Sequence, residues 1–391
     1  MLYEKNWARV WLGFGLVWFI AAIALAPSNK VYQQGLVAFL WLPTLVLAWS
    51  ARAVLVEAWR RQPVLWGAVM LMLVWGAISL AWSSAEDLGR EAKRLLYILV
   101  FLLAFPLLAQ AGPARIRHLL QLGSGLLAVA ALLSIVHFYA LQGNPLVDRL
   151  AGIGEISHPI LGAYVVGAAV LLLLYQLPHQ RVAQLAWLAA LACLGAFVVL
   201  SQSRGAVLAL LFTVVLAPVW FRDRHSRMIA IAAVIATGLA FCVIYDVITA
   251  RGASFRPQIF EVVMQMIGQH PWTGLGLGAP YKVNAAGLQF DHTHNMFTHV
   301  AVELGLPGMV MWIAIWLLTL GEIIRARRTL LGKILLGLWI FSTLAMQFDA
   351  ASLTATPRAE WFISWLIVGL AMLLPWGRAE NDACGKISGS T

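Results

Sequence analysis

Charged residues are scarce in this chain of 391 residues: only 11% are Asp, Glu, Lys or Arg, whereas a soluble globular domain carries about 25%. So little charge is not enough to cover a water-exposed surface. Hydrophobic residues make up 61% of the chain, and the mean hydropathy is +0.83. The composition therefore excludes a soluble or disordered protein and indicates one embedded in a membrane.

Cysteine is also scarce, and long runs of positive charge are missing. The three cysteines, Cys193, Cys242 and Cys384, do not make a disulfide scaffold, because two of them lie inside apolar stretches. The net charge is +10, but the basic residues occur singly or in groups of two or three between apolar stretches. This pattern is typical of membrane-protein loops, and we expect no nucleic-acid partner.

Twelve apolar segments approach the roughly 20 residues that a helix needs to cross a bilayer. Long unbroken runs favour helices, since a transmembrane barrel would show strands of alternating polarity. We therefore expect an all-α integral membrane protein in which residues 1–391 form a single polytopic domain. The predicted spans are 10–26, 31–49, 64–82, 95–110, 118–140, 159–177, 183–200, 205–221, 228–247, 296–320, 331–348 and 359–375.

Most of the 27 basic residues fall on one side of these spans if the N-terminus is cytoplasmic. An even number of spans then places both termini, including a tail over 376–391, in the cytoplasm. The opposite, outer face carries the longest connection, residues 248–295. In it, Ile259, Val263 and Ile267 recur at helical spacing after Pro257, which predicts an amphipathic helix lying against lipid or against the bundle.

A short motif closes this loop: His294-Asn295, nine further residues, Gly305, two more, and Gly308. In this position between two late spans, the motif resembles that of the O-antigen ligase family, which is similar in layout to O-antigen polymerases and protein O-oligosaccharyltransferases. The resemblance implies a GT-C-like multi-spanning glycosyltransferase in a Gram-negative bacterial inner membrane, with a periplasmic active site. It implies transfer of O-antigen polysaccharide from undecaprenyl diphosphate to a sugar of the lipid A core, for lipopolysaccharide biosynthesis. The implied mechanism is inverting and metal-independent, with no cofactor.

Three residues match essential positions of that family: Arg204 in a short outer joint, Arg256 early in the large loop, and His294. Their chemistry suits such a reaction. A departing diphosphate gains negative charge, which a guanidinium can stabilise through two oxygens at once. A histidine, whose reference pKa is about 6.5, can remove the proton of an acceptor hydroxyl. It can equally contact phosphate as an imidazolium, and the sequence leaves both roles open.

Weaker candidates for substrate binding lie on the same side, and each also fits an ordinary surface or structural role: Asn295, His158, Lys282, Arg358 and Arg94. His292 and His299 flank His294 and raise the alternative of a zinc site. No cysteine and no acidic partner beyond Asp291 accompanies them, so we expect no metal. The glycine-rich run 274–278 is expected to be a turn, because it lacks the Lys and Ser/Thr of a phosphate loop.

Two other kinds of function stay open. An O-antigen polymerase or a protein O-oligosaccharyltransferase would share the site and differ in its acceptor. A polymerase of this layout typically has two sizeable outer loops, and here only one is large. A lipid or ion transporter would show internal repeats with matching broken helices, and the two halves of the chain show no such repeat. We therefore expect a ligase, with the carrier-linked glycan, the lipid A core and membrane lipids as partners.

Overall fold

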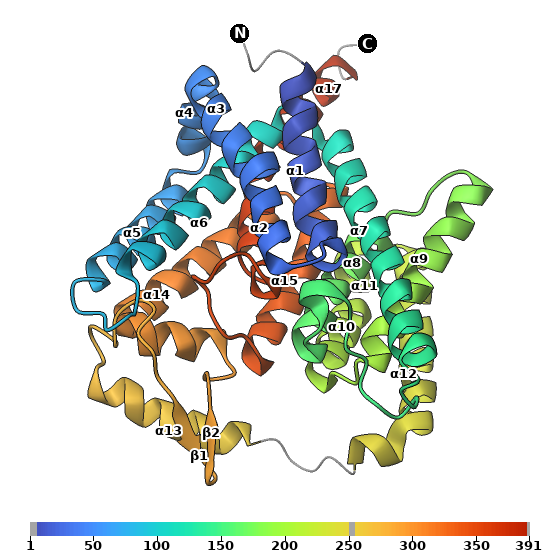
Figure 1. Cartoon of the computed structure of the whole chain (residues 1–391). Coiled ribbons are helices and arrows are strands. Elements are labelled where there is room, and N and C mark those ends of the chain that lie inside the picture. Colours follow the sequence, from blue (N-terminus) through green and yellow to red (C-terminus); the bar gives the residue numbers. More distant parts are fainter. Residues whose placement is uncertain (1–5, 250–254, 389–391) are drawn as a thin grey trace.

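The computed structural model describes residues 6–249 and 255–388, which form a helical bundle with one small hairpin (Figure 1). The N-terminal half contains α1 (Asn6–Leu25), α2 (Asn29–Leu36), the π-helical η1 (Val37–Trp41), α3 (Leu42–Ser50), α4 (Arg52–Arg61), α5 (Pro63–Ser79), α6 (Leu88–Ala109), α7 (Pro113–Ile135), the π-helical η2 (Val136–Leu141), the 3₁₀ turn η3 (Gly154–Ile156) and α8 (Pro159–Leu174). The C-terminal half contains α9 (Arg181–Leu200), α10 (Arg204–Leu216), α11 (Pro218–Phe221), α12 (Arg224–Thr249), α13 (Arg256–Gln269), β1 (Val283–Ala285), β2 (Leu288–Phe290), α14 (Met296–Arg325), α15 (Leu330–Phe348), α16 (Ala359–Phe362) and α17 (Trp365–Ser388).

Every predicted span is helical, which confirms an α-helical membrane protein. Within the described residues, nine helices or helix runs are long and apolar enough for a full crossing. A tenth candidate is the pair α4 and α5, which is bent by 102°; α4 was not predicted. The predicted spans 10–26 and 159–177 correspond to the shorter apolar helices Val10–Leu25 and Pro159–Leu174. Twelve complete crossings therefore stay a prediction.

The centre of the bundle is the run formed by α16 and α17. Of the residues Ala359–Trp376 in this run, 94% are buried inside the protein. Helix α17 packs against α6, α14 and α15. Trp365 contacts Trp312 of α14, with ring centroids 5.2 Å apart. The start of α1 and the end of α17 lie at one end of the bundle, and α13 with the hairpin lies at the other (Figure 1). This arrangement agrees with an even number of crossings.

The predicted amphipathic helix exists as α13, and its apolar face covers protein. Ile259, Val263 and Ile267 are buried together with residues of β1 and α14. The hairpin β1–β2 departs from the all-α prediction. Its two-residue turn, Ala286-Gly287, has positive φ at both positions, as a tight hairpin with right-handed strand twist requires. Residues 250–254 of the predicted loop 248–295 lie outside the described residues.

Helix α14 is interrupted at Gly305, which adopts φ 68° and ψ −177°. The backbone groups released there are satisfied by other segments. The carbonyls of Val302 and Glu303 accept hydrogen bonds from the N–H groups of Leu275 and Gly276, both at 2.9 Å. Two further bonds of this kind join Trp75 Nε1 to the carbonyl of Leu304 and the N–H of Leu306 to the carbonyl of Pro271.

The glycines of the motif and of the 274–278 turn are therefore one structural unit. A Cβ on Gly305 would lie 2.6 Å from the carbonyl oxygen of Trp272, and a Cβ on Gly274 would lie 2.4 Å from that of Glu303. Only glycine allows the turn to approach the broken helix this closely. The predicted turn is confirmed, and it completes the hydrogen bonding of α14.

Candidate active site

The loop that precedes α14 is shaped by a helix cap and by one strained residue. The Asn295 side chain accepts hydrogen bonds from the N–H groups of Phe297 at 2.9 Å and Thr298 at 3.1 Å, as an N-cap does. His294, just before it, has φ 54°, a left-handed conformation that is uncommon for a residue other than glycine. Such strain persists where surrounding contacts enforce it, and it is concentrated at functional sites.

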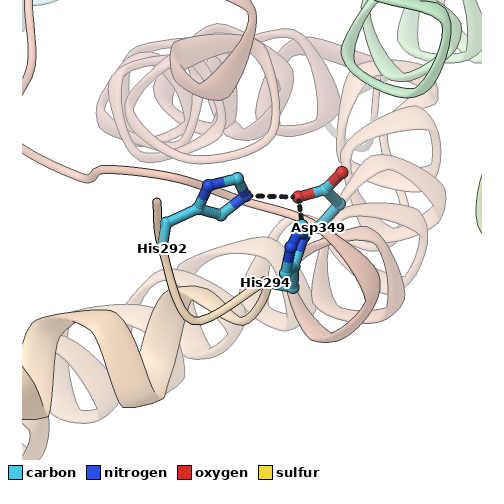
Figure 2. Close-up of side chains that lie close together, drawn as sticks. All are labelled: His292, His294 and Asp349. Carbon is cyan, nitrogen blue, oxygen red and sulfur yellow. Dashed lines mark hydrogen bonds and ion pairs between the residues drawn. The ribbon is translucent and has the colours of Figure 1, made fainter. Parts of the chain in front are cut away.

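Those contacts come from Asp349, the residue that follows α15. His292 Nε2 and His294 Nδ1 both lie 3.0 Å from the same carboxylate oxygen, Asp349 Oδ1 (Figure 2). Burial of Asp349 raises the pKa of its carboxyl, but the hydrogen bonds from the two imidazoles and their positive charge outweigh it. The pKa of Asp349 is therefore held well below its usual range, and the group is ionised at neutral pH.

The ionised carboxylate fixes which nitrogen of His294 carries the proton. Because a carboxylate only accepts hydrogen bonds, Nδ1 of His294 must be the donor, and Nε2 carries a lone pair whenever the ring is neutral. The His294 side chain is 24% exposed, whereas that of Asp349 is 4% exposed. A partly exposed imidazole held by a buried carboxylate is compatible with the role of general base, which the sequence leaves open.

Arg256 lies at the start of α13 and reaches the end of α15. Its Nε donates a 2.8 Å hydrogen bond to the carbonyl of Phe348, the residue before Asp349. This carbonyl belongs to the last turn of α15, where a positive charge is favourable. The guanidinium of Arg256 thus lies next to the backbone before Asp349. Its two other nitrogens take no part in this hydrogen bond.

Arg204 is exposed and begins α10, at the tight joint that the sequence predicted. The next residue, Gly205, faces Phe348: a Cβ on Gly205 would lie 2.9 Å from the Phe348 Cβ. Ser201 and Gln202 in the joint are buried, and their backbone and side chains bind the 147–150 segment. Arg256 therefore lies beside Phe348, and the start of α10, which carries Arg204, approaches the same residue through Gly205. His294 lies beside the adjoining Asp349.

His158 belongs to the same region. Its Nδ1 accepts the N–H of Leu161 at 3.3 Å, so it caps α8. Partial burial lowers the pKa of His158. The negative charge of Asp349 opposes this effect, and the positive charges of Arg149, His292 and His294 reinforce it. The structure thus brings His158 within electrostatic range of the histidine pair, and its role in substrate binding stays a prediction.

The other predicted substrate-binding residues already bind other protein groups or lie exposed at the edge of the candidate site. Arg94 binds both carboxylate oxygens of the buried Glu91 at 2.6 Å. Lys282 forms an exposed ion pair with Asp291 across the base of the hairpin. Arg358 is exposed before α16, and the charges of Arg358, Asp349 and His292 all act on Glu360. Besides its cap, Asn295 donates to Gln347 Oε1 at 2.7 Å. Substrate contacts of these four residues are untested.

Sequence reasoning missed Asp349 and used His292 only for the zinc alternative. Asp349 and His294 are 55 residues apart, and nothing local links them. Two signals were present. An aspartate directly follows the predicted span 331–348, and the spacing of His292 and His294 places both side chains on one side of an extended segment. The fold brings these two features together.

The same three side chains raise the question of a metal. The ligand atoms of His292, His294 and Asp349 lie within 4.8 Å of one another, and zinc accepts these atom types. In the structure each imidazole is already paired with the carboxylate. His299 is directed elsewhere: it contacts Tyr281 Oη at 2.6 Å through Nδ1 and Glu303 at 3.3 Å through Nε2.

Comparison with known proteins gives two matches. A family model described as O-antigen ligase matches residues 188–313, a segment that contains Arg204, Arg256 and His294 and ends before Asp349. An O-antigen ligase of Pseudomonas aeruginosa is 32% identical over 308 residues, which cover 76% of this chain and 74% of the relative.

Proposed function

Because the chain belongs to the O-antigen ligase family, we propose that it transfers O-antigen polysaccharide from undecaprenyl diphosphate to a sugar of the lipid A core. The observation that carries the proposal is the meeting of His294, Asp349 and Arg256 at one end of α15, close to the start of α10 that carries Arg204. This arrangement supplies a base for an acceptor hydroxyl and cations for a diphosphate, which are the two requirements of glycosyl transfer from a diphosphate carrier.

On the donor side, Arg204 and Arg256 bind the diphosphate. The bond between the anomeric carbon and the phosphate oxygen breaks with its electron pair on the oxygen, so negative charge grows on the leaving group. Guanidinium groups stabilise that charge through paired hydrogen bonds. Arg256 is held for this task by its bond to the carbonyl of Phe348, which limits the side-chain freedom lost on binding.

On the acceptor side, His294 Nε2 takes the proton of the core-sugar hydroxyl while the oxygen attacks the anomeric carbon. The resulting imidazolium is stabilised by Asp349 at 3.0 Å. Attack opposite the departing diphosphate inverts the configuration at that carbon. The charge that a metal would balance is balanced by the two arginines, so the reaction is metal-independent.

Arg256 begins α13, so the site lies at the end of the bundle that carries α13 and the hairpin, opposite the end where α1 begins and α17 ends (Figure 1). Most of the Lys and Arg residues lie on the side of the membrane that the N-terminus occupies. The two observations together support cytoplasmic termini in an inner membrane and an active site on the periplasmic face. The lipid A core and the carrier-linked glycan would both approach from the outer leaflet.

The test is reconstitution of the full chain in vesicles with an undecaprenyl diphosphate glycan and separate acceptors. Glycan joined to lipid A core supports the proposal. Product formed only with a second carrier-linked glycan, or only with a peptide, would make the protein a polymerase or a protein glycosyltransferase. A parallel reaction with EDTA should keep its full rate; loss of activity that zinc restores would contradict the metal-independent mechanism.

A further inference from the structure

The start of α10 carries a hydroxyl group that has no hydrogen-bond partner among the described residues. Ser203 occupies the N-cap position, yet its hydroxyl makes no capping bond. That hydroxyl is buried and has no partner among the described residues. Since the first N–H groups of a helix lack carbonyl partners within the helix, the N–H groups of Gly205 and Ala206 also face outward from the helix start.

A second unused hydroxyl lies against this turn. Tyr164 of α8 is 0% exposed, and no described atom accepts from or donates to its Oη. A Cβ placed on Gly205 would lie 3.2 Å from this oxygen, so the absence of a side chain at Gly205 brings the hydroxyl to the backbone. Leaving a buried hydroxyl without a partner is unfavourable, which indicates that an additional ligand completes it.

Two charges act on the Tyr164 hydroxyl, the negative charge of Asp349 more strongly than the positive charge of Arg256. The case for a negatively charged ligand therefore rests on the helix start and on the arginine. Gly205 also faces Phe348, whose carbonyl holds Arg256. Outward-facing N–H groups, a helix N-terminus and an arginine together favour an anion, and the O–H groups of Ser203 and Tyr164 can donate to it.

We propose that the start of α10, residues 203–206, and the Tyr164 hydroxyl form a binding site for phosphate oxygens of the diphosphate carrier. The inference rests on the proposed function and assigns a part of the diphosphate site that the two arginines alone do not provide. Tyr164 and the helix start bind oxygens of the diphosphate from the α8 and α10 side, and Arg256 binds from the α13 side. The bound diphosphate would be the ligand that the two hydroxyls lack.

The chain offers a matched control on the same helix. The hydroxyl of Tyr175 is also buried without a partner among the described residues, and its ring stacks on Phe221 with centroids 4.1 Å apart. It follows Tyr164 by about 16 Å of helix axis, towards the opposite end of α8. Tyr164→Phe and Tyr175→Phe therefore both remove a tyrosine hydroxyl that has no partner among the described residues. Tyr164 is fully buried and Tyr175 is half-buried, and of the two hydroxyls it is that of Tyr164 that lies beside α10.

The experiment measures binding of undecaprenyl diphosphate without glycan to the full-length protein and to both variants in nanodiscs. We expect Tyr164→Phe to weaken binding about tenfold or more, because a hydrogen bond to a charged group is lost. Tyr175→Phe should bind as the wild type does. Neither variant loses a hydrogen bond to any of the described residues, so their thermal unfolding midpoints should match or exceed that of the wild type.

The outcomes separate this inference from the proposed function. If the wild-type protein and Tyr164→Phe bind the carrier equally, the inference is overturned and the function stands. If both tyrosine variants weaken binding alike, the effect is not local and the inference also fails. If the wild type does not bind the carrier, both proposals fail.

A kinetic arm distinguishes the donor diphosphate from phosphates on the acceptor. In the transfer assay, Tyr164→Phe should raise the KM for the carrier-linked glycan and leave the KM for lipid A core unchanged. Ser203→Ala should act in the same direction as Tyr164→Phe. A rise confined to the KM for lipid A core would assign the anion site to the acceptor and overturn the inference.

Discussion

Two histidine–carboxylate pairs lie close together on this chain, and they differ in what surrounds them. His294 and Asp349 are 3.0 Å apart, and His294 is 24% exposed. His299 and Glu303 are 3.3 Å apart, and the His299 side chain is 5% exposed. The first pair joins two segments at a surface, whereas the second lies within a single helix and is covered by the loop of residues 270–282.

The second pair is enclosed by further bonds. His299 contacts Tyr281, and Glu303 accepts the N–H of Gly278 at 3.2 Å. Burial raises the pKa of Tyr281, and the nearby Glu303 raises it further, so its hydroxyl stays protonated. With both ring nitrogens in contact with protein, His299 fastens the loop to α14. The same two residue types thus occur once in a partly exposed pair, for which we propose a role as general base, and once in a buried pair that holds a loop in place.

The largest expected effect comes from removing the exposed imidazole. His294→Ala should reduce the transfer rate by about 10²- to 10⁴-fold, the usual contribution of a positioned general base. The thermal unfolding midpoint should fall modestly, because Asp349 loses one hydrogen bond and keeps the one from His292. The measurement is initial rate with saturating donor and acceptor. A normal rate would remove His294 from the mechanism.

Asp349→Asn should have a smaller effect of the same kind. The amide keeps the shape of the carboxylate but loses the charge that stabilises the imidazolium, and a hydrogen bond to a charged group contributes about 1.5–3 kcal/mol. We therefore expect a rate loss of roughly ten- to a hundredfold, with little change in the KM for the donor. A loss confined to the donor KM would instead place His294 on the diphosphate.

Removing the histidine of the buried pair should lower the stability of the protein and leave the transfer rate nearly unchanged. His299→Ala removes the imidazole that contacts both Tyr281 and Glu303, and among the described residues Glu303 keeps only the N–H of Gly278. The expected cost is about 1–3 kcal/mol in the free energy of unfolding. The unfolding midpoint should fall, while the transfer rate, measured well below that midpoint, should stay within about threefold of wild type. A large rate loss in stably folded protein would mean that the two pairs do not differ in role.

The smallest expected effect is a change in the stability of the protein at acidic pH. The folded pKa of Asp349 lies below its unfolded value of about 3.9. Ionised Asp349 therefore contributes stability that is fully present above about pH 4 and is lost as the pH falls through the folded pKa. Asp349→Asn lacks this contribution at every pH, so the gap between its unfolding midpoint and that of the wild type should shrink below pH 4. A constant gap would contradict this assignment.

Much of the fold follows from the sequence because apolar length dictates helices in lipid. The spans, the tight joint before Arg204 and the helix after Pro257 were predictable from local patterns. Asp349 was not, because its meaning depends on a histidine 55 residues away. The break at Gly305 was not either, since a lone glycine in an apolar run gives no sign that the 271–276 segment will supply the missing hydrogen bonds.

That break also has a mechanical consequence. The part of α14 from Met296 to Leu304 is a short helical segment. The contacts around Gly305 hold one end of it, and His294 lies just before the other end. Its fixed end is tied to α5 through the bond from Trp75 to Leu304. A small rotation of this segment about Gly305 would displace the His294 imidazole by a larger distance. The position of the imidazole therefore depends on backbone contacts far from the reacting atoms.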